Sequence, residues 1–290
     1  MMHPDSSASL PIESVLDDIR LQLHKNPTLL LIAEPGAGKT TRVPLALVQQ
    51  DWLGDKMIVM LEPRRLAARN AAKYMASQLG ENIGETVGYR IRLENRSSEK
   101  TRILVVTEGI LTRMLQSDPE LTGVGLVIFD EFHERSLNSD LGLAFCLEVV
   151  ETLRDDLLLV AMSATLDAGP VAALMNAPIV TSAGRAYPVE TRWLDRPLPA
   201  QAHKLDSLID LVVRAEAETR TMGGDILVFL PGEGEIRRAL AALTTRLPQD
   251  CQPEALFGAM PFEAQQAVLR PAEHGRKLVL ATAIAETSLT

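Results

Sequence analysis

Short runs of apolar residues alternate with longer stretches of helical period through the first 175 residues. Each run is continuously apolar, which indicates strands buried on both faces of a parallel sheet. Helices between such strands cover the two faces, so the sequence predicts a doubly wound α/β domain. The expected strands are 28–33, 56–62, 102–107, 124–131 and 157–163, and the expected helices are 39–50, 64–79, 108–114, 138–153 and 168–175.

A stretch rich in Pro and Arg, residues 184–200, interrupts this pattern. The α/β alternation restarts after it, and a chain of 290 residues has the length of roughly two domains. We therefore predict one domain over residues 1–185 and a second, incomplete α/β domain over residues 186–290. Its expected strands are 225–231, 254–257 and 277–282, and its expected helices are 202–219, 234–246 and 262–269.

Composition narrows the class of protein. The formal net charge is −9, so any contact with nucleic acid must use local basic clusters rather than bulk charge. No apolar run reaches the length of about 18 residues that a membrane helix needs, and the first residues lack the pattern of a secretory signal. Cys146 and Cys251 lack metal-site spacing and are expected in the core, in a reducing compartment, so the expected location is cytoplasmic.

The stretch AEPGAGKT, residues 33–40, lies between an expected strand and an expected helix. That context is typical of a phosphate-binding loop, in which glycines let backbone N–H groups surround phosphates. Lys39 is expected to reach the outer phosphates, and the Thr40 hydroxyl to bind Mg²⁺. A chance Gly-containing turn with a lysine is the alternative, and the flanking strand and helix disfavour it. The expected nucleotide contacts are Pro35, Gly36, Ala37, Gly38, Lys39, Thr40 and Thr41.

Two carboxylates, Asp130 and Glu131, end an apolar strand in VIFDEFHERS, residues 127–136. Ligands bind at the carboxyl ends of parallel strands, so we expect Asp130 to hold Mg²⁺ and Glu131 to activate the attacking water. Taken alone, the two carboxylates also fit a solvated strand end with an ion pair to Arg135. The phosphate loop favours the catalytic interpretation, because nucleotide hydrolysis needs both parts. His133 is expected either to bridge this site to the second domain or to bond a surface neighbour.

Three further stretches also follow expected strands. Arg64 and Arg65, in LEPRRLAARN, are expected to contact a phosphate backbone, or else to be surface charges of a helix. Thr107 and Gly109, in VVTEGILTRM, offer a hydroxyl and a backbone N–H to another phosphate, although Thr107 alone is better explained as a helix cap. All these stretches should gather at one edge of one sheet, together with the residues in AMSATLD that we expect to link the nucleotide site to the rest of the protein, Ser163 and Thr165.

The stretches GAGKT, PRRLAARN, TEGIL, DEFHERS, SAT, LVFLPG and ATAIAETSLT occur in the order of superfamily 2 helicase motifs. The chain resembles a DEAH-box ATP-dependent helicase, and PRRLAARN and DEFHERS resemble the bacterial HrpB branch. The resemblance covers nearly the whole chain. Three departures are Ala33 for the first loop glycine, Phe132 for the Ala of the family name, and Ala283 for a usual Asn.

The resemblance implies two RecA-like P-loop domains that bind ATP and Mg²⁺ between them. Asp130 and Glu131 match the family's metal-binding and catalytic carboxylates, and Ser163 and Thr165 match its coupling residues. Its nucleic-acid contacts match Arg64, Arg65, Thr107 and Thr282, the last within ATAIAETSLT. The family stacks the adenine between side chains, and we expect Tyr74 on one side of that stack.

The expected function is ATP hydrolysis coupled to stepping along single-stranded nucleic acid, with RNA as the expected strand. The family carries a paired-arginine motif after the stretch that ends this chain, and such an arginine accelerates hydrolysis by orders of magnitude. The alternative is a fragment that binds nucleotide and nucleic acid with little hydrolysis. We expect the reading frame to continue beyond Thr290 and residues 286–290 to be poorly ordered. A small-molecule kinase is disfavoured, because Glu131 beside Asp130 suits water activation.

Overall fold

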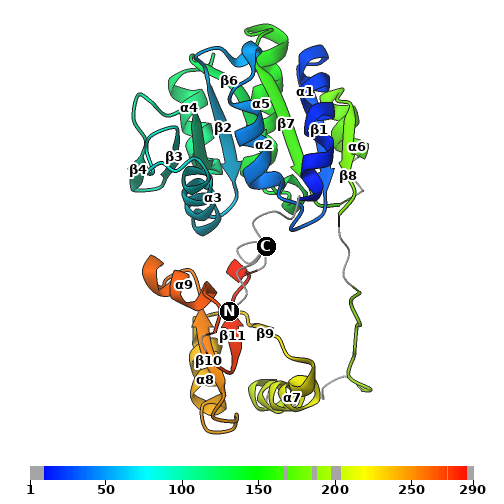
Figure 1. The fold of residues 1–290 in the computed structure, drawn as a ribbon, viewed down its shortest axis with the longest axis vertical. Helices are drawn as coiled ribbons and strands as arrows, with labels where there is room; N and C mark the ends of the chain where they lie inside the picture. The colour runs from blue at the N-terminus through cyan, green and yellow to red at the C-terminus, as the bar shows by residue number, and fades with distance from the viewer. Residues whose placement is uncertain (1–9, 166–168, 185–187, 197–203, 273, 286–290) are drawn as a thin grey trace. The chain divides into compact units, whose positions relative to one another are not determined.

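The computed structural model describes residues 10–165, 169–184, 188–196, 204–272 and 274–285. The chain folds into two compact units, Met1–Pro188 and Val189–Thr290 (Figure 1). Each unit has its own sheet and its own buried apolar clusters. The division between the units falls close to the predicted boundary at residues 185 and 186.

The first unit is built on one eight-stranded sheet with the order β4-β3-β5-β2-β6-β7-β1-β8 (Figure 1). Neighbouring strands are parallel except for the antiparallel pair β3 and β4. The doubly wound, mainly parallel α/β class predicted for this part is therefore confirmed. The strands are β1 (Thr28–Ala33), β2 (Met57–Glu62), β3 (Val87–Ile91), β4 (Glu94–Arg96), β5 (Ile103–Thr107), β6 (Val124–Phe129), β7 (Leu158–Ser163) and β8 (Ile179–Ser182).

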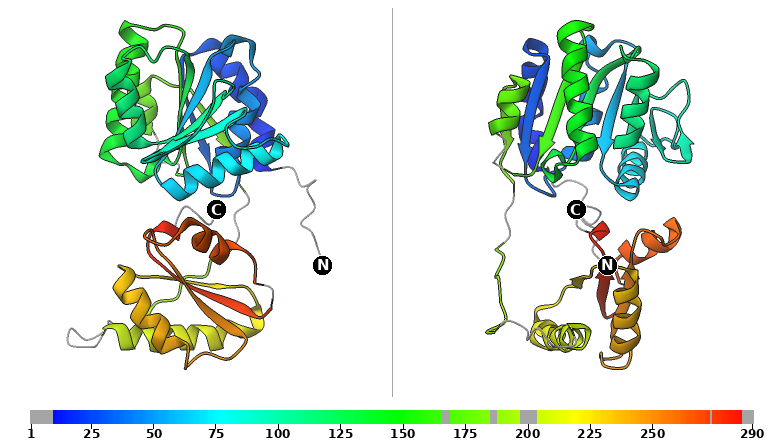
Figure 2. Two further views of the ribbon diagram at one scale, coloured as in Figure 1. Left: turned by 90° about the vertical axis from the view of Figure 1, so that its left-hand side faces the viewer. Right: turned by 180° about the vertical axis from the view of Figure 1, so that it is seen from behind.

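Helices cover both faces of this sheet, as the two rotated views show (Figure 2). Successive side chains of a strand point to opposite faces, and β1 follows this rule: Leu29 and Leu31 belong to one buried cluster, and Leu30 and Ile32 to the other. Three helices contribute to the first cluster, namely α1 (Leu16–Lys25), α2 (Lys39–Leu47) and α3 (Arg65–Gln78). Three contribute to the second, namely α4 (Glu108–Ser117), α5 (Leu137–Thr152) and α6 (Gly169–Met175).

Four elements of the first unit are absent from the sequence prediction: α1, β3, β4 and β8. The run that forms β3 is interrupted by Gly88 and Arg90, and β4 contains no apolar residue, so neither carries a strand pattern. The strand predicted to reach residue 131 ends at Phe129 instead. The chain turns there because Glu131 takes a left-handed conformation with φ of 49°, which no strand continues through.

The second unit has a smaller parallel sheet with the order β10-β11-β9. Its elements are α7 (Lys204–Thr219), β9 (Ile226–Phe229), α8 (Glu233–Leu243), β10 (Cys251–Leu256), α9 (Phe262–Leu269) and β11 (Arg276–Ala281). The predicted alternation of strands and helices is confirmed, although β10 begins three residues before the predicted strand. The expectation about residues 286–290 lies outside the described residues.

The two cysteines are free and buried, as predicted, and burial raises the pKa of the Cys146 thiol to about 12. Within the described ranges, every helix is too short or too polar to cross a lipid bilayer.

Gly88 is the residue of β3 that permits the close approach of β4. A Cβ atom at this position would lie 2.6 Å from the Arg96 carbonyl oxygen, a backbone atom that moves only if the strand moves. We expect Gly88→Ala to lower the free energy of unfolding by about 1–3 kcal/mol, the usual penalty for overpacking. Gly169→Ala is the matched control, because a Cβ there meets nothing within 4 Å. Chemical denaturation of both variants measures this; equal stabilities would contradict the close packing at Gly88.

Candidate nucleotide and nucleic-acid site

The predicted motifs all follow strands that are neighbours in the sheet. In the order β5-β2-β6-β7-β1 these strands are parallel, so their carboxyl ends lie at one edge. That edge receives the phosphate loop after β1, the arginines after β2, Thr107 at the end of β5, the carboxylates after β6, and Ser163 at the end of β7. The topology therefore brings together the stretches that were expected at one sheet edge.

The loop between β1 and α2 has the backbone shape that its glycines predict. Gly36 and Gly38 both have positive φ, 76° and 91°, and Gly38 begins α2. A Cβ on Gly38 would come within 2.7 Å of a methyl carbon of Leu10, so only glycine fits without a shift. The buried Ala37 links the loop to the preceding segment, because its carbonyl accepts a hydrogen bond from the Ile12 N–H at 3.1 Å. The departure at Ala33 is accommodated, since this residue ends β1 with its side chain in the core.

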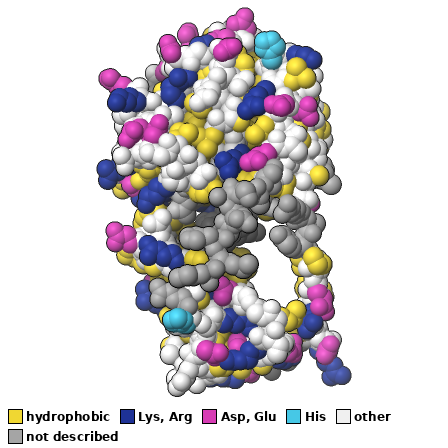
Figure 3. Space-filling model, viewed as in Figure 1, with side chains coloured by type: hydrophobic (Ala, Val, Ile, Leu, Met, Phe, Trp, Pro, Cys, Tyr) yellow, Lys and Arg dark blue, Asp and Glu magenta, His cyan; other side chains and the backbone are white. Residues whose placement is uncertain are grey.

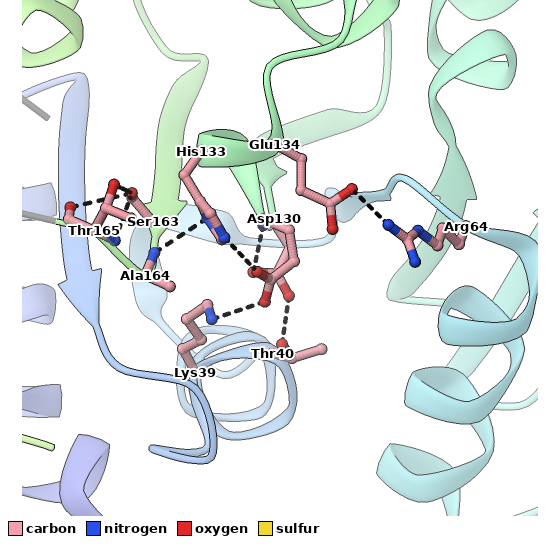
Figure 4. A network of polar contacts seen from close by, with 10 residues as sticks. Lys39, Thr40, Arg64, Asp130, His133, Glu134, Ser163, Ala164 and Thr165 are labelled. Carbon is pink, nitrogen blue, oxygen red and sulfur yellow. Dashed lines mark hydrogen bonds and ion pairs between the residues drawn. The ribbon is translucent and has the colours of Figure 1, made fainter. Parts of the chain in front are cut away.

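Lys39 and Glu131 form an ion pair at the centre of the site (Figure 4). The Lys39 ammonium lies 2.7 Å from Glu131 Oε1, and their side chains are only 5% and 14% exposed. The left-handed backbone of Glu131 turns this residue out of the line of β6. A non-glycine residue in that conformation carries strain, and such strain is frequent at functional sites.

Asp130 is held from two directions. The Thr40 hydroxyl donates to Asp130 Oδ2, and the Glu131 N–H donates to Asp130 Oδ1 at 2.8 Å. The Asp130 side chain is buried, and burial together with the charge of Glu131 raises the pKa of its carboxyl. Thr40 and Asp130, the two residues expected to bind the metal, are thus adjacent oxygen donors in the structure.

His133 connects the carboxylates to the end of β7. The Ala164 N–H donates to His133 Nδ1 at 3.2 Å, and His133 Nε2 lies 3.4 Å from Glu131 Oε2 (Figure 4). An acceptor at Nδ1 places the imidazole proton of a neutral ring on Nε2, which faces the carboxylate. Ser163 and Thr165 shape the turn around Ala164, because the Thr165 N–H donates to Ser163 Oγ at 3.2 Å. The bonds of His133 described here therefore lie within the first unit, toward the Ser163–Thr165 turn.

Glu62 is a third carboxyl group of the site that the sequence patterns did not reveal. It ends β2, beside β6, and is only 2% exposed. One of its oxygens has no hydrogen-bond partner among the described residues. Burial, and then the neighbouring Asp130, raise the pKa of Glu62 well above its ordinary value. Its place as the polar last residue of a buried strand, two residues before Arg64, was the one available signal.

The residues expected to contact nucleic acid are arranged around the same sheet edge. Arg64 precedes α3 and lies 3.4 Å from Glu134, while Arg65 is exposed. Thr107 occupies the cap position of α4, yet its side chain makes no capping hydrogen bond. The cap interpretation therefore leaves the Thr107 hydroxyl unexplained. A Cβ at Gly109 would meet nothing within 4 Å, so the backbone there is open to a ligand.

Two of the predicted contacts lie away from this cluster. Tyr74 is on α3 with 45% of its surface exposed, and its proposed stacking on adenine stays a prediction. Thr282 follows β11 in the second unit, where its N–H donates to the Leu256 carbonyl at 3.2 Å. Its proposed contact with nucleic acid also stays a prediction.

Charge is mixed over the surface near the site. On the face of the first unit shown in Figure 3, lysine and arginine side chains are interspersed with aspartate and glutamate. This distribution agrees with the net charge of −9, which requires that any nucleic-acid contact use individual basic groups.

Known proteins share this fold and sequence. The chain is 51% identical over 286 residues to the ATP-dependent RNA helicase HrpB of Escherichia coli, and 38% identical over 290 residues to the pre-mRNA-splicing factor ATP-dependent RNA helicase prp22 of Schizosaccharomyces pombe. These matches cover 98% and 97% of this chain but only 34% and 24% of the relatives, so the chain spans about a third of their length or less.

Solved structures agree with these sequence matches. A crystal structure of the Escherichia coli DEAH/RHA helicase HrpB superposes with a TM-score of 0.89 and 49% sequence identity, covering 97% of this chain and 36% of that one. The family model described as DEAD/DEAH box helicase matches residues 16–174, which is more than half of the chain. The chain belongs to the DEAD/DEAH box helicase family and resembles the N-terminal part of HrpB.

Proposed function

We propose that this chain binds ATP with Mg²⁺ and couples ATP hydrolysis to movement along single-stranded RNA. The observation that carries the proposal is the buried contact between Lys39 of the phosphate loop and Glu131 after β6, beside the contact between Thr40 and Asp130. It joins a phosphate-binding lysine directly to a carboxylate that is placed to activate water.

The donor atoms fit Mg²⁺ rather than a transition metal. Among the residues that the structure describes, no group of three or more His, Cys, Asp or Glu side chains is arranged to hold a metal. Mg²⁺ does not require such a cage, because it keeps several waters and is bound through one or two side chains plus substrate phosphates. Thr40 and Asp130 supply two oxygen donors, and the raised pKa of Asp130 reflects an excess of negative charge that a cation would relieve.

The residues of the chain then have distinct tasks. Mg²⁺ bound at Thr40 and Asp130 would neutralise charge on the phosphates. Lys39 exchanges its partner Glu131 for a phosphate oxygen, which frees the Glu131 carboxylate. Glu131 then orients a water and takes its proton, while His133 holds the second oxygen of that carboxylate through Nε2. The Ser163–Thr165 turn senses the change through the Ala164–His133 hydrogen bond.

RNA is the proposed strand because the relatives are named RNA helicases. Arg64, Arg65 and the Thr107 hydroxyl would contact its phosphates, which makes binding nearly independent of sequence and sensitive to salt. Thr282 would add a contact from the second unit, and Tyr74 would stack on the adenine of ATP. The cytoplasm is the proposed location.

An alternative function applies to the chain taken alone. The relatives extend well beyond the matched part, and an arginine supplied from elsewhere would raise the hydrolysis rate by orders of magnitude. The isolated chain would then bind nucleotide and RNA with little turnover. A steady-state ATPase assay with and without single-stranded RNA separates the two, because RNA-stimulated turnover by this chain would exclude the binding-only alternative.

Glu131→Gln tests the assignment of the catalytic base. The variant keeps the shape of the side chain but cannot accept the water proton, so we expect kcat to fall by about 10²–10⁴-fold, the usual value of a general base. ATP affinity should stay near that of the wild type, as measured by fluorescence titration. Glu151→Gln, an exposed residue of α5, is the control that removes one charge elsewhere. Undiminished turnover by Glu131→Gln would contradict the role of Glu131.

Glu62→Gln tests whether the third carboxyl is held neutral. Burial raises the folded-state pKa of Glu62 above its unfolded value, so the folded protein retains a proton that the unfolded chain releases. Wild-type stability is therefore fully present below the unfolded pKa and is lost as pH rises toward the folded pKa, by up to about 1.4 kcal/mol per pH unit. In Mg²⁺-free buffer, the melting temperature of Glu62→Gln should gain on that of the wild type between pH 5 and about pH 8. A difference that does not change with pH would count against a neutral Glu62.

A further inference from the structure

Glu134 belongs to the same short turn as the catalytic Glu131. The 3-10 turn Phe132–Glu134 is closed by the Glu134 N–H, which donates to the Glu131 carbonyl at 2.9 Å. The buried Phe132 fixes it to the core, with its ring edge-on to Phe129 at 6.1 Å between centroids. Residues on both sides of the turn, Glu131 and Arg135, have φ of 49°. A movement of Glu134 is therefore transmitted through few bonds to Glu131.

The two ends of this turn contact different parts of the site. Glu131 reaches Lys39 of the phosphate loop, and Glu134 points the other way to Arg64, which precedes α3 (Figure 4). The Arg64–Glu134 distance is 3.4 Å, and both side chains are partly exposed, 23% and 25%. Two groups that bind different ligands in the proposed function are thus joined by one turn.

The Glu134 carboxylate lies where a phosphate of the nucleic acid would approach Arg64. Guanidinium groups bind carboxylates and phosphates through the same N–H fork. The start of α3 adds to the demand for an anion, because its first turn contains no acidic residue. A phosphate at Arg64 would meet the Glu134 charge at close range, so the two anions compete for one arginine.

We infer that Glu134 substitutes for an RNA phosphate at Arg64 and is a positioning residue that reports RNA arrival to Glu131. This inference rests on the proposed function. Without RNA, the Arg64–Glu134 pair holds the turn in the arrangement in which Glu131 faces Lys39. A phosphate at Arg64 releases Glu134, and the turn is then free to present Glu131 to water. Because the pair is partly exposed, its displacement should reduce RNA affinity by only about threefold to fivefold.

Glu134→Gln tests this coupling, because it removes the competing charge and preserves the shape of the side chain. We expect a fluorescently labelled oligouridine RNA to bind about threefold to fivefold more tightly. ATP turnover without RNA should rise, while turnover at saturating RNA stays the same, so the degree of RNA stimulation falls. A merely structural role would lower the melting temperature without changing this ratio.

Glu151→Gln is the matched control, with the same change of charge at the opposite end of α5, about 20 Å along the helix axis. It should leave RNA affinity and stimulation unchanged. Arg64→Gln and the double variant Arg64→Gln/Glu134→Gln complete a cycle, in which the gain from Glu134→Gln should vanish once Arg64 is absent.

Two results would overturn the inference: wild-type affinity and stimulation in Glu134→Gln, or a gain that persists in the Arg64→Gln background. Failure of the proposed function gives a different result, because the wild-type chain itself would then neither bind the RNA nor hydrolyse ATP.

Discussion

One buried lysine faces three carboxyl groups at the centre of this structure. Lys39 pairs with Glu131, and Asp130 and Glu62 are fully buried beside them. Ionised carboxylates are too costly to bury without compensation. The site meets this constraint by a hydrogen bond from Thr40 to Asp130, by the lysine, and by a raised pKa at Glu62. A divalent cation is the remaining partner that such a cluster would accept.

The sheet explains how groups from distant parts of the chain reach this cluster. Five neighbouring parallel strands end at one edge, and each delivers a polar residue or loop to it. The turn after β6 connects these contributions, because Glu131 meets the phosphate loop, His133 meets the end of β7, and Glu134 meets the arginine after β2. Chemistry at one point of the edge is therefore joined mechanically to the neighbouring points.

Much of this arrangement could be predicted from the sequence, because buried parallel strands are continuous apolar runs. The ends of β1, β2, β5, β6 and β7 and the residues after them were located in this way. The β3–β4 hairpin was not, since Gly88 and the polar segment Glu94–Arg96 carry no strand pattern. Glu62 was missed because its neutral state depends on burial beside Asp130. The Arg64–Glu134 pair joins residues 70 positions apart, and no local pattern marks such a contact.

The central claim is that Lys39 exchanges its carboxylate partner for a phosphate of ATP. Titration of Mg²⁺-ATP into the wild type and Lys39→Met tests it most directly. The variant loses a charge-assisted hydrogen bond to the nucleotide, and its dissociation constant should rise by about 10–100-fold. Its fold should persist in Mg²⁺, since the cation still balances Asp130. Wild-type affinity in a folded Lys39→Met would contradict the account.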